Sequence, residues 1–231
     1  MTAASLPICV KAISIDLDGT MLDTIGDLSM AVNHMLDELK LPPLDLELVR
    51  TFVGKGIANL VERSLRAAMG REPDGEFIAR ARPLYEAHYE RVNGQTTTIY
   101  PGVPEGLERL AAAGFPLACI TNKSKRFTGP LLSRIGFAHY FSLVVCGDSL
   151  PKRKPDPLPL THAAGHFGVA PADMLMIGDS VNDAQAARAA GCPVFCVTYG
   201  YNEGADVRTL DVDAIVPTLV EAADLVRRTT S

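Results

Sequence analysis

Two aspartates near the start of the chain have the residue type and spacing for chemistry. Asp16 and Asp18 follow CVKAISI, residues 9–15, an apolar run typical of a buried strand. In an extended backbone, side chains two positions apart point to the same side. Two carboxylates held together repel each other, and one takes up a proton unless a cation lies between them. A hard divalent ion with oxygen ligands, most plausibly Mg²⁺, would resolve this conflict, so the spacing favours a metal site.

A plain turn is the alternative for the same residues. Asp18-Gly19 is a common turn pair, so the two aspartates could be purely structural. A calcium-binding loop fits less well, because Gly19 comes too early for that motif and the terminal Glu is missing. Whether Asp16 and Asp18 form a structural turn or a metal site depends on which other residues the fold brings close to them.

Three later segments carry further candidates, each after a strand-like run. Thr121 and Asn122, in ACITNKS, could offer a hydroxyl, an amide and backbone N–H groups to a phosphoryl oxygen, or could cap the next helix. Lys154, in the proline-rich PKRKPDPLPL, could neutralise charge, although a basic loop is often only solvated. Asp179 and Asp183, in LMIGDSVND, could bind a cation or simply favour a helix start. Together, these motifs favour an active site.

These candidates can meet only if a sheet brings strand ends together. From residue 100 onward, helix-like segments end at Gly and a short apolar run follows each one. The pairs are EGLERLAAAG and FPLACI, LLSRIG and SLVVC, HAAGHFG and MLMI, and AQAARAAG and PVFCV. With CVKAISI as the first strand, they predict a Rossmann-like, doubly wound α/β fold with a parallel sheet. Ligands of such sheets bind beyond the carboxyl ends of the strands, where the candidates would converge.

The segment between residues 25 and 95 has a different pattern. Apolar residues keep helical spacing through it, and no convincing strand interrupts them. We predict an inserted helical-bundle cap domain over residues 23–95, with residues 1–22 and 96–231 forming a catalytic core. TTTIYPGV is the expected return linker from the cap to the core.

Composition and charge narrow the classes of partner. The chain has 231 residues, 47% of them hydrophobic, and a net charge of −5, so it can bury a sizeable core and carries no broad basic field. Nucleic acid and membrane surfaces are therefore not expected partners, and a small substrate is. Five cysteines lack metal-ligand spacing, and neither a signal peptide nor a membrane span is evident, which predicts buried thiols and a cytoplasmic protein. A monomer and a homodimer are both compatible with the sequence.

The ordered motifs have a family resemblance. DLDGT at residues 16–20, Thr121 after a strand, Lys154 before a proline and GDSVND at residues 178–183 resemble the four motifs of the haloacid dehalogenase-like hydrolases. The resemblance covers about residues 10–225. It implies a Rossmann-like core with a helical cap inserted after the first motif, in agreement with the periodicity.

The resemblance also implies roles for the acidic residues. Asp16 would be the nucleophile that forms an aspartyl-phosphate, and Asp18 would protonate the leaving alkoxide and later activate water. Mg²⁺ would lie between Asp16, the backbone carbonyl of Asp18 and Asp179. Asp183 would anchor either Lys154 or metal-bound water. Asp23 falls outside the motifs and is expected to be a hinge or turn residue.

The remaining motif residues would bind the phosphoryl group and set the reaction type. Thr121 and Lys154 would hold phosphoryl oxygens, and Lys154 would also balance the charge of the nucleophile. Thr20 favours hydrolysis, because phosphoglucomutase-like relatives typically have Val there. Phosphonatases of this family use a cap lysine as a Schiff base, a role open to Lys55, but they replace the second aspartate, and Asp18 is present. A protein that only binds a ligand would be expected to lose one of the two aspartates.

The cap suggests a substrate. RTFVGKGIANLVERSL, residues 50–65, resembles the cap segment of bacterial phosphoglycolate phosphatases, which implies hydrolysis of 2-phosphoglycolate to glycolate and phosphate. The turn from Gly54 to Gly56 precedes a helix, so its amides and the Lys55 ammonium could meet the substrate carboxylate. A flexible, exposed turn is the alternative. Relatives with similar caps hydrolyse sugar phosphates or N-acetylmuramate 6-phosphate, which keeps those substrates open.

Overall fold

The computed structural model describes residues 6–229, and its main feature is a parallel sheet. Within these residues six strands pair in the order β6-β5-β2-β7-β8-β9, and every pairing is parallel. They are β2 (Ala12–Ile15), β5 (Leu117–Ile120), β6 (Leu143–Val145), β7 (Met174–Gly178), β8 (Val194–Val197) and β9 (Ala214–Val216). The predicted α/β fold class is confirmed.

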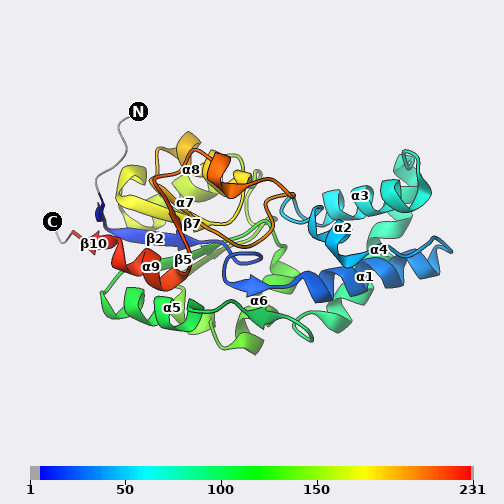
Figure 1. Ribbon diagram of the computed structural model, residues 1–231, viewed down its shortest axis with the longest axis horizontal. Coiled ribbons are helices and arrows are strands. Elements are labelled where there is room, and N and C mark those ends of the chain that lie inside the picture. The colour runs from blue at the N-terminus through cyan, green and yellow to red at the C-terminus, as the bar shows by residue number, and fades with distance from the viewer. Residues whose placement is uncertain (1–5, 230–231) are drawn as a thin grey trace.

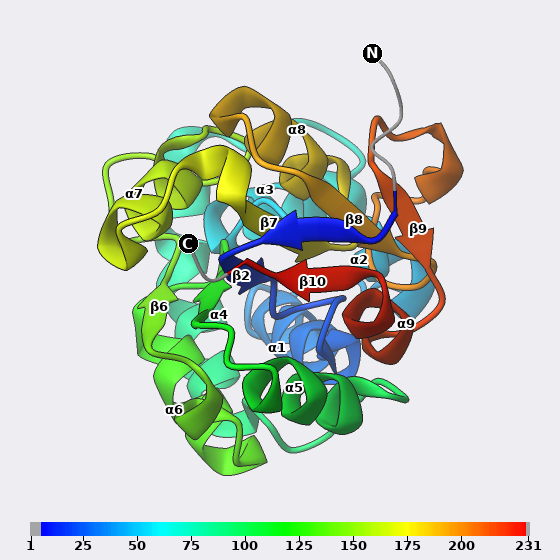
Figure 2. The same cartoon turned by 90° about the vertical axis from the view of Figure 1, so that its left-hand side faces the viewer.

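Helices cover both faces of this sheet. On one face, α5 (Val103–Ala112), α6 (Lys125–Ile135) and α9 (Leu219–Asp224) pack on one apolar cluster. On the other, α7 (Leu158–Phe167) and α8 (Val181–Ala190) pack on a second. Figure 2 shows α7 and α8 on one side of the strands, with α5 and α9 on the other. Because both faces are covered, the central strands β2 and β7 are buried along their whole length, and their residues are apolar except for Ser14.

A group of helices lies beyond one end of the sheet (Figure 1). It consists of α1 (Ile25–Glu38), α2 (Leu46–Arg50), α3 (Ile57–Met69) and α4 (Gly75–Val92), which pack mainly around an apolar cluster of their own. The chain enters and leaves this group through β3 (Leu22–Asp23) and β4 (Thr98–Ile99), an antiparallel pair. The helices and their linkers lie where the cap was expected; the domain boundaries stay a prediction.

The first strand differs from its expected form. CVKAISI was expected to be one strand, but it divides at Lys11 into β1 (Ile8–Val10) and β2. Lys11 is half-exposed and pairs with Asp173 at 3.2 Å, so a charged side chain interrupts the apolar run. β1 pairs in parallel with β10 (Val226–Arg228), outside the main sheet. Within residues 6–229, three short 3₁₀ turns complete the elements, at Ala138–Tyr140, Pro171–Asp173 and Val207–Thr209.

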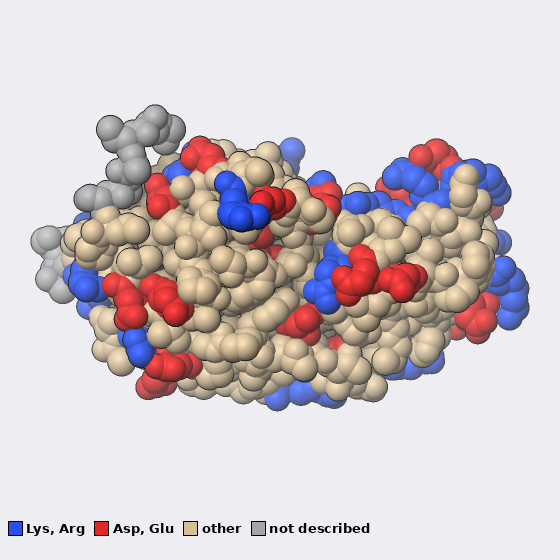
Figure 3. Space-filling model, in the orientation of Figure 1, with Lys and Arg blue, Asp and Glu red and all other residues tan. Residues whose placement is uncertain are grey.

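The surface charge is mixed. On the face shown in Figure 3, acidic and basic side chains are interspersed, and no broad basic region covers either half. Among residues 6–229, no helix has the length and apolar character needed to cross a membrane.

Candidate active site

The candidate residues meet at one edge of the sheet. Asp16, Thr121 and Asp179 come directly after β2, β5 and β7, which are neighbours in the sheet. Ile15 is in register with both Cys119 and Ile177, so the three strands end at nearly the same level. The parallel topology therefore places a carboxylate, a hydroxyl and a second carboxylate side by side, as the sequence predicted.

Lys154 reaches this edge from the loop after β6. Its ammonium lies 3.0 Å from Asp16 Oδ1 and 2.7 Å from Asp183 Oδ1, and it donates to the Ile120 carbonyl at 2.5 Å. Lys154 is 2% exposed. Burial disfavours its charge, but the carboxylates of Asp16 and Asp183 outweigh this and raise the pKa of Lys154, so the lysine stays cationic.

Asp183 is held by the start of α8. Its Oδ2 accepts hydrogen bonds from the Ser180 hydroxyl at 2.7 Å and from the Ser180 backbone N–H at 3.1 Å. This is a capping box, the structural alternative that the sequence left open for this aspartate. The same carboxylate also binds Lys154, so capping and site assembly are two functions of one side chain.

Three buried carboxylates form a cluster beside Lys154. Asp16, Asp179 and Asp183 each place an oxygen within 4.8 Å of the others. Burial raises the pKa of Asp16 to about 7 although Lys154 opposes it, and burial with Asp183 and Asp16 raises the pKa of Asp179 well above its usual value. One lysine cannot balance three carboxylates. The donor set, with its excess of buried anionic oxygen, suits a hard divalent cation.

Asp179 is held in place by close packing. Its Oδ1 accepts from the Thr20 hydroxyl at 2.9 Å, and its Oδ2 accepts from the Tyr201 backbone N–H at 2.6 Å. A Cβ at Gly19 would lie 2.2 Å from Asp179 Oδ2, and one at Gly200 would lie 2.4 Å from it. Both glycines also have positive φ, of 91° and 104°. Only glycine allows the two backbones to approach this carboxylate from both sides.

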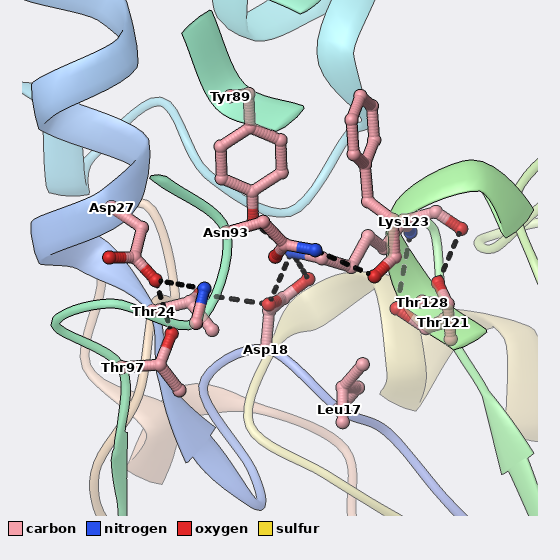
Figure 4. A network of polar contacts seen from close by, with 12 residues as sticks. Leu17, Asp18, Thr24, Asp27, Tyr89, Asn93, Thr97, Thr121, Lys123 and Thr128 are labelled. Carbon is pink, nitrogen blue, oxygen red and sulfur yellow. Dashed lines mark hydrogen bonds and ion pairs between the residues drawn. The ribbon is translucent and has the colours of Figure 1, made fainter. Parts of the chain in front are cut away.

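Asp18 has partners of its own. Its carboxylate oxygens lie 3.0 and 3.2 Å from Lys123 Nζ, and its Oδ1 accepts from the Thr24 hydroxyl at 2.8 Å. Lys123 also contacts the Tyr89 hydroxyl, which comes from α4 in the cap. Figure 4 shows Tyr89 above Asp18 and Lys123 beside it. The two aspartates that the spacing paired are therefore each in contact with a different lysine.

A cavity of about 50 Å³ lies between the strand ends and the helices of the cap. From the core it is lined by Asp16, Asp18, Thr121, Asn122 and Lys123, and from the cap by Gly54, Gly56, two tyrosines and four aliphatic side chains. Both aspartates thus face one small space, which fits a ligand with few atoms.

The chain that carries this site matches a known sequence family. Residues 13–197 match the sequence family described as "Haloacid dehalogenase-like hydrolase". This chain belongs to the haloacid dehalogenase-like hydrolases. Asp16, Thr121, Lys154 and Asp179 all lie within the matched segment, which ends with β8.

Individual relatives of this haloacid dehalogenase-like hydrolase share nearly its full length. A phosphoglycolate phosphatase of Nitrosospira multiformis is 56% identical, with 96% of this chain and 98% of the relative covered. One from Thiobacillus denitrificans is 52% identical over 97% of this chain and 99% of the relative. A crystal structure from Haemophilus somnus, described as a "predicted phosphoglycolate phosphatase", has a TM-score of 0.89 and 34% identity, covering 93% of this chain and 97% of that one.

Two of the expected substrate-binding residues, Lys55 of the cap and Asn122 of the core, have other contacts in this hydrolase. Lys55 does not line the cavity; its ammonium lies 2.5 Å from Glu203 Oε1. Asn122 uses its side-chain amide to donate to the carbonyls of Gly54 and Lys154, both at 2.8 Å. Asn122 therefore joins the cap turn to the core loop that carries Lys154.

Other contributing residues were not singled out from the sequence. Lys123 follows Thr121-Asn122 directly, so its position next to a motif was a usable signal. Tyr89 was not identifiable, because only the fold brings α4 over the sheet edge. Tyr201 accepts from the Thr24 and Ile25 N–H groups at 2.7 and 3.1 Å and donates to Asp23 at 2.6 Å. The segment 200–204 therefore links Asp179 to the start of α1.

Proposed function

We propose that this haloacid dehalogenase-like hydrolase is a Mg²⁺-dependent phosphomonoester hydrolase that acts through an aspartyl-phosphate, with 2-phosphoglycolate as its substrate. The observation that carries the proposal is that Asp16 and Asp18, which both line one small cavity, are each paired with a different buried lysine. Lys154 forms an ion pair with Asp16, and Lys123 forms one with Asp18. The two carboxylates therefore have different surroundings, which suits a nucleophile and an acid–base residue.

Asp16 is the proposed nucleophile. Among residues 6–229, the Leu17 backbone N–H and the Lys154 ammonium both contact Oδ1, at 2.8 and 3.0 Å, and Oδ2 has no such partner. Oδ2 is therefore free to attack phosphorus in line. A bond forms between this oxygen and phosphorus while the bond from phosphorus to the leaving oxygen breaks.

Asp18 is the proposed general acid and base. It gives its proton to the departing alkoxide, then takes a proton from the water that attacks the aspartyl-phosphate. This second attack breaks the bond between phosphorus and the Asp16 oxygen and releases phosphate. Both aspartates return to their starting protonation states, so the cycle consumes one water for each ester hydrolysed.

Thr121 and Lys154 are proposed to hold the phosphoryl oxygens. The Thr121 hydroxyl accepts from the Lys123 backbone N–H at 3.1 Å, so its own hydrogen remains available for a phosphoryl oxygen. The Asn122 side-chain amide already has its two donors in use, so we assign it to holding the cap turn.

Mg²⁺ is proposed to be held by Asp16, Asp179 and the backbone carbonyl of Asp18. When bound, it would neutralise the charge of the phosphoryl group and the attacking carboxylate. The excess of carboxylate over lysine in this cluster supports the assignment. Asp183, through Lys154 and Ser180, would keep the cluster in place.

The names of the relatives and the cavity support 2-phosphoglycolate as the substrate. Both relatives cited above are called phosphoglycolate phosphatases. A cavity of about 50 Å³ favours a two-carbon leaving group over a hexose. Hydrolysis of a sugar phosphate or of N-acetylmuramate 6-phosphate is the second candidate, and it would require the cap to open further.

A steady-state screen of phosphate release tests the proposal. The substrates are 2-phosphoglycolate, hexose 6-phosphates, N-acetylmuramate 6-phosphate and an aryl phosphate, each with Mg²⁺ and with EDTA. We expect 2-phosphoglycolate to lead in kcat/KM by about tenfold or more, equivalent to roughly 1.4 kcal/mol in transition-state binding, and EDTA to stop turnover. A higher kcat/KM for a sugar phosphate would contradict only the assignment of 2-phosphoglycolate as the substrate. Turnover of every ester in the presence of EDTA would contradict the proposed dependence on Mg²⁺.

A further inference from the structure

Lys123 is a buried cation to which the proposed reaction assigns no contact with the substrate. Its side chain is 3% exposed, and its ammonium lies against Asp18 and the Tyr89 hydroxyl at the cavity wall. Burying an ammonium is unfavourable unless anions or dipoles compensate for lost water. Asp18 is one such partner. Because Asp18 is the proposed proton donor to the leaving oxygen, Lys123 lies at the leaving-group end of the cavity.

A second group at this end lacks a partner. Tyr85 is 0% exposed and lines the cavity, stacked on Tyr89 with ring centroids 5.6 Å apart. Its hydroxyl makes no hydrogen bond with any residue in the range 6–229. An unpaired buried hydroxyl is unfavourable, and buried polar groups are normally satisfied. Its place in the cavity wall suggests that a ligand supplies the missing partner.

The remaining cap wall excludes charge. Four aliphatic side chains complete it, those of Leu28, Val53, Ile57 and Leu60. A charged substituent on the leaving group could not be stabilised there. Among the described residues that line the cavity, Lys123 is the one cation, and it lies at the end where the Tyr85 and Tyr89 side chains also line the wall. The Lys123 ammonium has three N–H donors. Two of them can bond to the Asp18 carboxylate and the Tyr89 hydroxyl, which leaves the third for a ligand.

We propose that Lys123, together with Tyr85 and Tyr89, binds a carboxylate on the leaving group and so selects short phosphorylated 2-hydroxy acids. This inference rests on the proposed phosphatase function and deepens it. It assigns the carboxylate to a lysine inside the cavity, in place of Lys55, which pairs with Glu203 outside it. The charges are then divided along the substrate, with Lys154 at the phosphoryl end and Lys123 at the carboxylate end.

Two substrates of matched size separate this role from support of Asp18. 2-Phosphoglycolate and 2-hydroxyethyl phosphate differ by a carboxylate in place of a neutral CH₂OH group. Lys123→Met should lower the ratio of their kcat/KM values by about tenfold or more, because a charge-assisted contact is lost for only one of them. Tyr85→Phe should lower the same ratio by less. Lys125→Met, which removes the same charge from an exposed site two residues away, should leave it unchanged.

Equal losses on both substrates in Lys123→Met, with no shift in Tyr85→Phe, would overturn the inference and leave Lys123 as a partner of Asp18 only. If Lys55→Ala lowers the ratio of the two kcat/KM values and Lys123→Met does not, the substrate carboxylate binds at the cap turn and the inference is wrong.

A binding measurement keeps this test separate from the proposed function. Asp16→Asn enzyme, titrated calorimetrically with each ester in Mg²⁺, should bind 2-phosphoglycolate at least about tenfold more tightly than 2-hydroxyethyl phosphate. The double variant Asp16→Asn/Lys123→Met should lose this preference. Equal affinities in the single variant would overturn the carboxylate site even if the native enzyme hydrolyses both esters. A native enzyme that hydrolyses neither would overturn the phosphatase assignment.

Discussion

Asp16 and Asp18 are two residues apart, yet their surroundings differ. Asp16 lies with Asp179 and Asp183 in a cluster short of positive charge, and burial raises its pKa to about 7. Asp18 faces Lys123 and a threonine hydroxyl. The sequence identified both aspartates, because their place after a buried strand is unusual for charge. The family resemblance already implied Lys154 as the partner of Asp16, whereas Lys123 was not singled out, because only the fold brings it to Asp18.

Lys154 should matter for stability as well as activity. Lys154→Met leaves two buried carboxylates without their cation, which typically costs about 3–5 kcal/mol. We expect urea unfolding to show a loss of this size, together with loss of phosphate release. Lys152→Met, at an exposed position in the same loop, is the matched control and should change neither property. A Lys154→Met protein as stable as the control would contradict the pairing seen with Asp16 and Asp183.

At the scale of elements, Asp27 joins the first cap helix to the return linker. It is fully buried near the start of α1. Its carboxylate accepts from the backbone N–H groups of Gly94 and Thr96, both at 2.7 Å, and from the hydroxyls of Thr96 and Thr97 at 2.7 and 2.6 Å. This joint could not be predicted from the sequence, because donors and acceptor are nearly seventy residues apart.

Removal of this carboxylate should loosen the cap linkers. Asp27→Ala leaves buried N–H and hydroxyl donors unpaired, and we expect a loss of about 2–4 kcal/mol in the free energy of unfolding. Thermal and urea unfolding measure it. The matched control is Asp37→Ala, an exposed position on the same helix, with an expected change within about 0.5 kcal/mol. Equal losses in the two variants would count against the joint.

Gly200 gives a test of the segment that follows β8. A Cβ there would lie 2.4 Å from Asp179 Oδ2, so Gly200→Ala should displace this carboxylate. We expect a rise of about tenfold in the Mg²⁺ concentration that gives half-maximal activity. Gly204→Ala is the control that separates backbone strain from a clash with Asp179. Gly204 also has a positive φ, 80°, but its Cβ would meet nothing closer than 3.8 Å. The same Mg²⁺ requirement in both variants would contradict a direct role for Gly200.

At the scale of the whole molecule, burial sets the reactivity of the thiols. Of the chain's five cysteines, Cys9 is exposed and the other four are buried. Burial raises the pKa of Cys192 to about 12 and also raises the pKa of Cys119, Cys146 and Cys196. A thiol reagent at pH 8 should therefore modify one cysteine quickly in the native protein and all five after unfolding. Fast modification of two or more native thiols would contradict the described packing.

The parallel sheet and the inserted helical stretch could be predicted from the sequence. The pairing of the terminal strands and the lining of the cavity could not. Apolar runs separated by helices that end at Gly indicate a parallel sheet, and a long helical stretch indicates the inserted cap. The pairing of β1 with β10 gave no signal, because strands of three residues have no measurable period and their partners lie at opposite ends of the chain. The cavity wall was equally hidden, since Tyr85 and Tyr89 look like ordinary core positions of a helix.

The most direct test of the central claim is a pre-steady-state experiment on Asp18→Asn with 4-nitrophenyl phosphate and Mg²⁺. This leaving group needs no proton, so Asp16 should still be phosphorylated, whereas the water step lacks its base. We predict a burst of about one nitrophenolate per enzyme followed by slow turnover, with the phosphate located on Asp16 by mass spectrometry of the acid-quenched protein. Asp16→Asn should show neither burst nor turnover. Continued turnover in Asp16→Asn, or phosphate on another residue, would contradict the aspartyl-phosphate mechanism.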